Sequence, residues 1–295
     1  MENLSDIGTV KKLLGKYGFK FSKTLGQNFI VSPSVCPKMA SECAKSPEAG
    51  IIEIGPGIGV LTVELAKRFK KVDSIEIDKK LIPILQETTS EFKNIKIINN
   101  DILKVNLHEI IKTEFTGFNE ICVCANLPYY ITSEIIMYIL ESELGIKSIV
   151  VMVQKEAAER ICAEPGTRES GAISLAVRFY GEPKILFNVK KGCFLPSPNV
   201  DSSVIKIELD KTKSKDIKNK KMFFKVVKVA YSKRRKNLLN SLSMGLEISK
   251  VKIKEILKIA EINPSYRAEQ LKFEDFVKIS DALNIKELIK KIYTR

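Results

Sequence analysis

An alternation of short apolar runs with segments of helix length most constrains the fold of this chain. The first five runs are almost continuously apolar, as strands are when both of their faces are buried. Strands that alternate with helices predict an α/β fold, in which helices cover both faces of a mostly parallel sheet. The candidates for this seven-stranded sheet are residues 50–54, 72–77, 95–99, 121–125, 148–153, 185–189 and 203–209.

Helices are predicted on either side of this pattern. Apolar residues at helical spacing predict a helix over 3–18, and a proline just inside its start predicts another over 33–44. Residues 211–221 hold six lysines and one apolar side chain, which predicts a solvated linker. The sequence therefore predicts two domains, 1–210 and a small all-helical domain over 211–295. The helical periodicities of the second domain lie at 222–243, 249–261, 273–283 and 285–293.

The positive charge of the chain is concentrated in its last third. The chain has 49 Lys and Arg against 35 Asp and Glu, a formal net charge of +14 and a pI near 9.3. Residues 206–295 hold 24 Lys and Arg against 11 Asp and Glu, so they carry +13 and the first 205 residues carry +1. Such an excess predicts a polyanionic partner. We therefore expect a neutral and a basic domain to have separate roles.

Cysteine and histidine usage excludes several kinds of chemistry. The chain has six cysteines and one histidine, His108, with no cluster at the spacing of zinc ligands. We expect reduced, buried thiols and no metal site. A single histidine also disfavours Ser-His-Asp and Cys-His catalysis. The N-terminus has no signal-peptide pattern and no 18-residue apolar run occurs, so a cytoplasmic protein without a membrane span is expected.

A glycine-rich loop follows the first predicted strand. The run over 51–62, IIEIGPGIGVLT, indicates a strand, a loop and the start of a helix. Glycines at this place let a ligand approach the main chain at a helix N-terminus, where open α/β sheets bind cofactors. The dinucleotide fingerprint GxGxxG requires a glycine at the position of Val60, which disfavours a nicotinamide cofactor. A nicotinamide-dependent dehydrogenase stays open as an alternative.

Two acids stand at the ends of the next two predicted strands. Glu76 follows Gly55 by 21 residues, where a carboxylate can accept both hydroxyls of a ribose, and Asp101 comes after the third strand. Each acid alone could be an exposed strand end or a helix cap. Together with the glycine loop they predict a nucleotide-like ligand.

The run NLPYYI over 126–131 follows the fourth predicted strand and carries the most specific chemistry. An exocyclic amine on a base is a poor nucleophile because its lone pair is delocalised into the ring. The Asn126 side-chain oxygen and a main-chain carbonyl near Leu127 could accept its hydrogens and draw the nitrogen toward tetrahedral geometry. Pro128 stiffens the turn, and Tyr129 offers a flat face for an extruded base.

At this point the sequence resembles the class I S-adenosylmethionine-dependent rRNA adenine dimethyltransferases, specifically those of the small subunit. The resemblance covers nearly the whole chain and implies the class I Rossmann-like methyltransferase fold. The matching pieces are LGQNF at 25–29, EIGPG at 53–57, EID at 76–78, ND at 100–101, NLPYYI at 126–131, QKE at 154–156, FLPSPNVDS at 194–202 and SKRRK at 232–236.

The resemblance implies roles for individual residues. S-adenosyl-L-methionine is the implied cofactor, with Asn28 and the Ile30 main chain closing over the methyl donor and Glu76 holding its ribose. Phe194 is the implied second stacking residue, opposite Tyr129; a core phenylalanine is the alternative. The implied cofactor-binding residues are Asn28, Ile30, Gly55, Gly57, Glu76, Asp101 and Asn126. The implied catalytic residues are Asn126, Leu127, Pro128, Tyr129 and Phe194.

The implied reaction is attack of an adenine amine on the sulfonium methyl group, repeated on the same nitrogen. The implied target is two adjacent adenines in the loop of the 3′-terminal hairpin of small-subunit (16S) rRNA, during 30S ribosome biogenesis. The partner would be this rRNA within a 30S assembly intermediate, bound by a monomer. The domain over 1–210 would then bind the cofactor and catalyse the transfer, and the domain over 211–295 would bind RNA.

The basic residues Lys233, Arg234, Arg235 and Lys236 are the predicted RNA-binding segment, within a helical stretch. A solvated charged face is the alternative for this run. Two further alternatives for the whole protein stay open. One is a large-subunit (23S) rRNA adenine dimethyltransferase of the antibiotic-resistance type, and the other is a non-catalytic RNA-binding factor of ribosome assembly.

Overall fold

The computed structural model describes residues 3–22, 24–210, 217–233 and 235–293. The chain divides into two compact units. Unit 1 comprises Met1–Ala158 and Glu182–Leu209, and unit 2 comprises Glu159–Gly181 and Asp210–Arg295. The predicted division at residue 210 into two functional domains stays a prediction. Residues 159–181, which it placed in the first domain, pack with the second unit.

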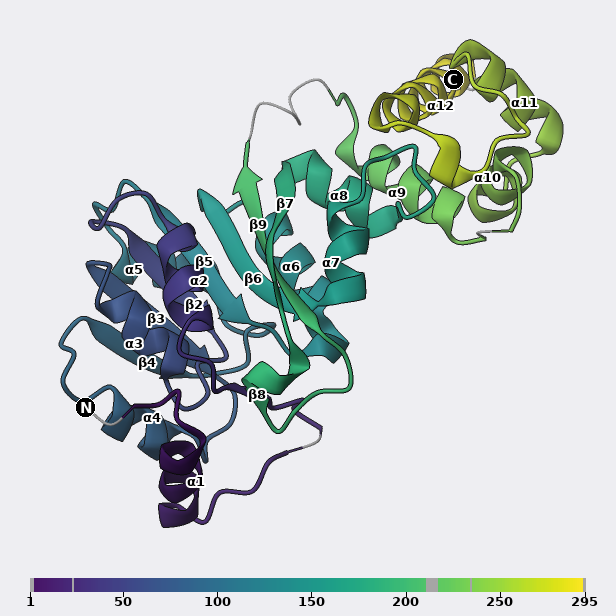
Figure 1. Cartoon of the computed structure of the whole chain (residues 1–295). Helices are drawn as coiled ribbons and strands as arrows, with labels where there is room; N and C mark the ends of the chain where they lie inside the picture. Colours follow the sequence, from purple (N-terminus) through teal and green to yellow (C-terminus); the bar gives the residue numbers. More distant parts are fainter. Residues whose placement is uncertain (1–2, 23, 211–216, 234, 294–295) are drawn as a thin grey trace. The chain divides into compact units, whose positions relative to one another are not determined.

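Unit 1 contains a seven-stranded sheet in the order β4-β3-β2-β5-β6-β9-β7 (Figure 1). Strands β2 to β6 are parallel, and β9 runs antiparallel to β6. All seven predicted strands are confirmed, and so is the mostly parallel α/β sheet. Their bounds are β2 Gly50–Ile54, β3 Lys71–Glu76, β4 Ile95–Asn99, β5 Ile121–Asn126, β6 Ser148–Gln154, β7 Gly181–Val189 and β9 Ser202–Leu209.

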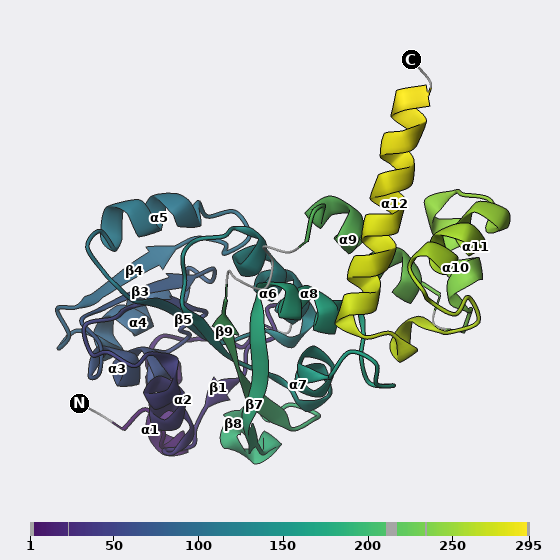
Figure 2. The ribbon, with the colours of Figure 1, turned by 90° about the horizontal axis from the view of Figure 1, so that it is seen from above.

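Burial explains why these strands could be recognised. Every residue of β2 is buried, as are the first five of β5 and the first six of β6, because helices cover both faces of the sheet. In Figure 2 the helix α5 lies on one side of the sheet, and α2 and α3 lie on the other. The helices of unit 1 are α1 Ile7–Lys16, α2 Val35–Cys43, α3 Val60–Ala66, α4 Ile82–Thr88, α5 Leu107–Glu114 and α6 Thr132–Glu141, followed by α7 Lys155–Cys162, which crosses into unit 2.

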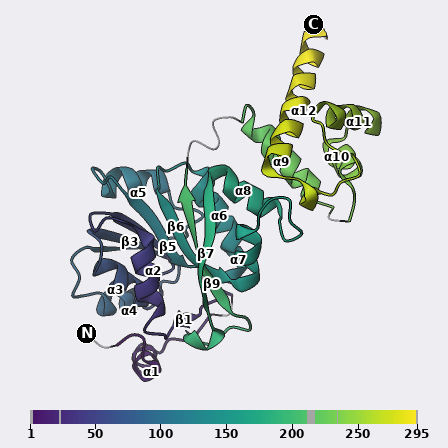
Figure 3. The same cartoon turned by 45° about the horizontal axis from the view of Figure 1, so that its top comes forward.

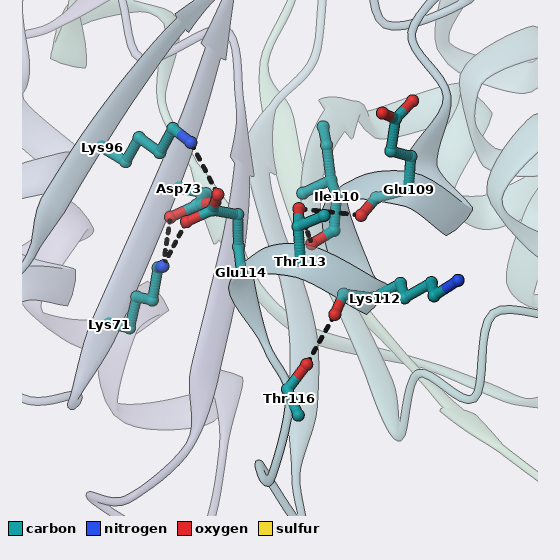
Figure 4. Close-up of polar contacts among 9 residues, drawn as sticks. All are labelled: Lys71, Asp73, Lys96, Glu109, Ile110, Lys112, Thr113, Glu114 and Thr116. Atoms are coloured by element: carbon teal, nitrogen blue, oxygen red, sulfur yellow. Dashed lines mark hydrogen bonds and ion pairs between the residues drawn. The ribbon is translucent and has the colours of Figure 1, made fainter.

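Polar contacts fix α5 on its face of the sheet. Figure 4 shows Lys71 and Asp73 of β3 and Lys96 of β4 pointing toward Glu114 at the end of α5. The Glu114 carboxylate accepts from Lys71 Nζ at 2.6 Å and from Lys96 Nζ at 2.7 Å. These hydrogen bonds, Lys71 first, lower the pKa of Glu114 to about 2. None of these four residues lines the cavity that opens at the carboxyl ends of the strands.

A second, two-stranded sheet lies outside the predicted pattern. Strand β1 (Phe29–Ile30) pairs antiparallel with β8 (Phe194–Leu195), placing Phe29 opposite Leu195 and Ile30 opposite Phe194. Two residues are too few to produce a periodicity. The pairing brings the LGQNF and FLPSP segments together, although they are far apart in the sequence.

Unit 2 has its own apolar core, which includes the fully buried Phe223 and Phe276. Among its described residues after Asp210 no strand occurs, as predicted. The helix predicted over 222–243 is wrong in one respect, because it is interrupted at the turn residues 232–233 and 235–236. Asn237 then caps a new helix by accepting from Asn240 N–H at 3.0 Å. The helices are α8 Ala172–Tyr180, α9 Lys220–Tyr231, α10 Leu238–Leu246, α11 Lys250–Ile259 and α12 Phe273–Tyr293 (Figure 3).

The last two predicted helices form one. Helix α12 runs through Asn284, the residue that separates the predicted segments 273–283 and 285–293. Asn284 is tolerated inside the helix because its side-chain oxygen accepts from Asn219 Nδ2 at 3.0 Å. Of the helices in the described ranges, none is long and apolar enough to cross a membrane.

Candidate active site

A cavity at the carboxyl ends of β2, β3 and β5 gathers most of the predicted site residues. From the N-terminal segment, the glycine loop and the end of β3 come Asn28, Ile30, Gly55, Gly57 and Glu76. From the end of β5 and the turn after it come Asn126, Leu127, Pro128 and Tyr129. All these residues belong to unit 1.

The glycine loop leaves room for a ligand at one position and packs tightly at another. Gly55 and Gly57 have φ angles of +67° and +61°, a left-handed region that favours glycine. A Cβ atom on Gly57 would lie 3.0 Å from the Phe29 ring, so this glycine is required for the N-terminal segment to close against the loop. A Cβ on Gly55 would meet only the Asn126 carbonyl oxygen, at 3.9 Å. The side of Gly55 that would carry a side chain is therefore open.

Glu76 is tied to this loop by its carboxylate. The side chain is buried, with 4% exposed, at the last position of β3. One oxygen accepts from Gly57 N–H at 3.0 Å and the other from Asp78 N–H at 2.8 Å. Burial raises the pKa of Glu76, and these hydrogen bonds to the main chain oppose the rise. The carboxylate is thereby fixed at the cavity wall with lone pairs left over for further donors.

Asn126 is oriented by the N-terminal segment. Its Nδ2 donates to the Asn28 carbonyl oxygen at 3.1 Å, a contact between residues 98 positions apart. A carbonyl can only accept, so the amide nitrogen must face Asn28 and the Oδ1 atom is left as an acceptor. Asn28 is itself held, because its own Nδ2 donates to the Gly26 carbonyl at 3.1 Å. An acceptor for an amine hydrogen is therefore present at the cavity.

The turn after Asn126 contains the second predicted acceptor, the Leu127 carbonyl. Leu127 N–H donates to the Met152 carbonyl of β6 at 3.1 Å, which anchors the start of the turn. The Pro128 carbonyl accepts from Ile131 N–H at 3.3 Å and from Thr132 Oγ1 at 3.0 Å. No main-chain N–H of the described loops donates to the Leu127 carbonyl. The role of this carbonyl as an acceptor for the amine stays a prediction.

Tyr129 lies in the cavity wall with its hydroxyl bonded away from solvent. Its hydroxyl oxygen is 2.7 Å from Ser202 Oγ at the start of β9. Burial raises the pKa of Tyr129, so the phenol is neutral at physiological pH. The flat face predicted for stacking is thus carried by a half-buried ring whose tip is fixed.

Two predicted site residues are not in the cavity wall. Asp101 accepts from Leu103 N–H at 3.0 Å and lies 3.7 Å from Lys104 Nζ, beyond the end of β4. Phe194 is only 4% exposed and belongs to the apolar core of unit 1, opposite Ile30 in the β1–β8 pair. Phe194 therefore lies in the core, which is the alternative to a stacking position that the sequence left open. The cofactor contact of Asp101 and the stacking role of Phe194 stay predictions.

Gln27 and Ile77 line the cavity but received no role from the sequence. Gln27 Nε2 donates to Asp78 Oδ2 at 2.7 Å, and its Oε1 accepts from Ser22 N–H at 2.8 Å. Gln27 thus ties the N-terminal segment to the loop that follows β3. Ile77 is 50% exposed beside Glu76, an apolar surface at the cavity. The LGQNF and EID runs contain both residues and were the available signal.

The predicted RNA-binding segment lies in unit 2, between α9 and α10. Lys233, Arg235 and Lys236 are exposed in the turn that separates these helices, and Lys236 N–H donates to the Lys233 carbonyl at 2.8 Å. Arg234 lies outside the described residues. Lys233, Arg235 and Lys236 are therefore not part of a helix, which corrects the expected helical setting. Its role in RNA binding stays a prediction.

Comparison with known proteins identifies the relatives of this chain. The family model described as ribosomal RNA adenine dimethylase matches residues 18–284. Proteins named ribosomal RNA small subunit methyltransferase A are similar over nearly their full length. The one from Geobacillus sp. (strain WCH70) is 43% identical, covering 96% of this chain and 98% of its own. The one from Clostridioides difficile (strain 630) is 44% identical, with 97% and 99% covered.

Solved structures match the fold. A dimethyladenosine transferase from Plasmodium falciparum superimposes with a TM-score of 0.73 and 23% identity, covering 88% of this chain and 98% of its own. The 23S rRNA methyltransferase ErmE gives a TM-score of 0.66 and 22% identity, with 87% and 99% covered. The class I methyltransferase fold is therefore confirmed. At these identities the superpositions carry fold information only.

Proposed function

Because the chain belongs to the ribosomal RNA adenine dimethylase family, we propose that it dimethylates the exocyclic amines of two adjacent adenines in small-subunit rRNA. The family and the sequence relatives make the chain an S-adenosylmethionine-dependent rRNA methyltransferase. The nicotinamide dehydrogenase and the non-catalytic factor lose their support. The observation that carries the proposal is the Asn126 amide, whose nitrogen is engaged by Asn28 and whose oxygen is left to accept.

The cavity fits S-adenosylmethionine. The open side of Gly55 would take the methionine part, and the buried Glu76 carboxylate would accept the ribose hydroxyls. Ile77 offers an apolar surface beside Glu76 for the purine. Asn28 and Ile30 would close over the methyl donor from the N-terminal segment. When bound, this cofactor supplies an electrophilic methyl group on a positively charged sulfur.

The residues of the chain would prepare the amine to receive that group. Asn126 Oδ1 and the Leu127 carbonyl accept the two amine hydrogens, which localises the nitrogen lone pair. Tyr129 supports the base by stacking, with Phe194 as the expected second stacking residue. An amine that has received the methyl group would be acidic, and its proton would pass to water without a dedicated base. In the second methylation the nitrogen carries one hydrogen, so one of the two acceptors would hold it while the first methyl group takes the place of the other hydrogen.

The fold alone does not distinguish small-subunit from large-subunit rRNA as the target. The 23S rRNA methyltransferase ErmE has the same fold at 22% identity, whereas the relatives above 40% identity over nearly the whole chain are named for the small subunit. These relatives favour small-subunit rRNA. Within it, we propose the loop of the 3′-terminal hairpin of 16S rRNA as the target. The large-subunit alternative is therefore the outcome against which the proposal is tested.

Docking on RNA is assigned to the basic part of the chain. Unit 2 holds 26 Lys and Arg against 13 Asp and Glu, a net charge of +13, and unit 1 carries +1. We assign catalysis to the domain over 1–210 and RNA binding to 211–295, with Lys233, Arg234, Arg235 and Lys236 contacting phosphates. The partner would be a 30S assembly intermediate in the bacterial cytoplasm. We propose that the protein acts as a monomer.

The test is a methylation assay with both ribosomal subunits. Unmethylated small and large subunits are incubated separately with the protein and labelled S-adenosylmethionine, and the labelled nucleotides are mapped. Label on two adjacent adenines of the 3′-terminal hairpin of small-subunit rRNA is expected. Label in large-subunit rRNA, or in neither RNA, would refute the proposal.

A further inference from the structure

A hydrogen bond joins the cavity wall to the interior of the sheet. The hydroxyl oxygens of Tyr129 and Ser202 lie 2.7 Å apart, although 73 positions separate the residues in the sequence. Tyr129 lines the cavity, whereas Ser202 has no exposed surface. Neither the family pattern considered above nor the proposed mechanism gives Ser202 a role.

The position of Ser202 is fixed by contacts of β9 with two other segments of the chain. It is the first residue of β9 and lies opposite Gln154 in the antiparallel pairing with β6. The preceding Asp201 accepts from Lys191 N–H at 3.0 Å through its carboxylate, and from Lys155 N–H at 3.0 Å through its carbonyl. The Ser202 hydroxyl therefore occupies a position that three connected segments determine.

The Tyr129 ring is consequently fixed at both ends. Its main chain is set by the Pro128 turn, where the Pro128 carbonyl accepts from Ile131 N–H and Thr132 Oγ1. Its tip is set by Ser202. We propose that Ser202 is a positioning residue, whose hydroxyl fixes the plane of the Tyr129 ring for stacking on the target adenine. This inference rests on the proposed function, in which Tyr129 contacts that base.

Loss of the Ser202 hydroxyl has a definite consequence for the amine. The half-buried phenol loses its partner, so the ring can rotate about its side-chain torsions and leave the stacking plane. An adenine stacked on a rotated ring no longer presents its amine to Asn126 and Leu127 at the required distance. Small displacements of this kind reduce the rate of the chemical step more than they weaken docking.

The next residue of the strand is a matched control. Ser203 is also fully buried, and its hydroxyl also makes one 2.7 Å hydrogen bond, to Asn188 Oδ1. Successive residues of a strand point to opposite faces, so Ser203 is directed away from Tyr129. Ser202→Ala and Ser203→Ala remove the same atom at the same depth and differ in the partner that is lost.

The kinetic test compares single-turnover methylation of unmethylated small subunits by the full-length variants. Ser202→Ala is expected to lower the rate about tenfold, with KM for the particle and S-adenosylmethionine affinity changed less than about twofold. Tyr129→Phe should cause a similar loss, and the double variant should lose no more than either single one. A rate for Ser202→Ala equal to that of Ser203→Ala, or losses that multiply in the double variant, would overturn the inference.

A second readout does not depend on methylation. The eight tyrosines are replaced by 3-fluorotyrosine, and the fluorine resonance that Tyr129→Phe removes is assigned to Tyr129. Ser202→Ala should shift and broaden this resonance, and Ser203→Ala should leave it in place; an unchanged resonance in Ser202→Ala refutes the positioning role. If the wild-type protein labels no adenine of the small subunit, the proposed function fails, while the fluorine spectra still decide whether Ser202 positions the ring.

Discussion

The cavity of unit 1 and the basic segment of unit 2 hold their polar groups in different ways. In the cavity, Glu76, Asn126 and Tyr129 each have a partner from a distant part of the chain, at 3.0, 3.1 and 2.7 Å. In the basic segment, by contrast, the side chains of Arg235 and Lys236 are exposed in a turn.

The difference separates two tasks. Moving a methyl group to an amine requires acceptors and a stacking face at defined distances, which buried hydrogen bonds provide. Holding a polyanion requires charge, which long exposed side chains provide with little geometric demand. Substitutions in the cavity should therefore change rates and cofactor binding, and substitutions in the basic segment should change RNA affinity.

The largest effect is expected at Asn126. Asn126→Ala removes an amine acceptor, and we expect the methylation rate to fall about 1000-fold while S-adenosylmethionine affinity changes less than about threefold. Rapid-quench kinetics and calorimetry measure the two quantities. Asn94→Ala is the control, since Asn94 Nδ2 also donates to main-chain carbonyls, of Ala66 and Phe69, outside the cavity wall. Retained turnover in Asn126→Ala would contradict the amine-activation argument.

Glu76→Gln should act on the cofactor. The main-chain N–H groups of Gly57 and Asp78 both donate to the Glu76 carboxylate. A glutamine amide would place its own NH2 group against one of these two donors. We expect S-adenosylmethionine affinity to fall about 100-fold by calorimetry. Glu114→Gln removes a carboxylate that also has two donors, but on the α5 face, and should leave the affinity unchanged. Equal losses in the two variants would argue against a cofactor role for Glu76.

Charge reversal in the basic segment should act on RNA alone. We expect Arg235→Glu with Lys236→Glu to weaken binding to small subunits about tenfold at low salt, to reduce its salt dependence and to leave cofactor affinity intact. The control is the same change in charge on α11 of unit 2, at the exposed Lys252 and Lys254. An equal loss in the control would assign docking to the overall charge of unit 2 and not to the segment.

The smallest effect concerns stability and pH. Burial raises the pKa of Glu53 to about 7, and the hydrogen bond from Ser74 opposes the rise. Between the ordinary value of 4.5 and about 7, the unfolded chain is ionised at Glu53 and the folded protein is protonated, so the free energy of unfolding falls as pH rises. In Glu53→Gln this fall should be smaller by on the order of 1 kcal/mol between pH 5 and 7.5.

Denaturant unfolding at the two pH values checks this. Glu87→Gln, which alters an exposed carboxylate, is the control for the general effect of removing one negative charge. A wild-type protein and a Glu53→Gln variant with parallel pH dependence would show that Glu53 ionises normally in the folded protein.

The sheet could be predicted from the sequence because the central strands of the sheet are buried on both faces and the turns contain glycine. It was insufficient where contacts join distant segments. The Asn126–Asn28 and Tyr129–Ser202 hydrogen bonds leave no local pattern, and neither does the two-residue pair of β1 with β8. Asn284 resembles a helix break until its partner Asn219 is known. The motifs identified most of the cavity wall, whereas only the structure indicates how each side chain is oriented.

The most direct test of the account is the chemical identity of the product. Small-subunit rRNA, methylated by the wild-type protein and digested to nucleosides, is analysed by mass spectrometry for mono- and dimethylated adenosine. The account predicts N6,N6-dimethyladenosine at two residues per particle with wild type, and almost none in the same reaction time with Asn126→Ala. Methylation at a ring nitrogen, or on any base other than adenine, would contradict the claim that the cavity activates an exocyclic amine.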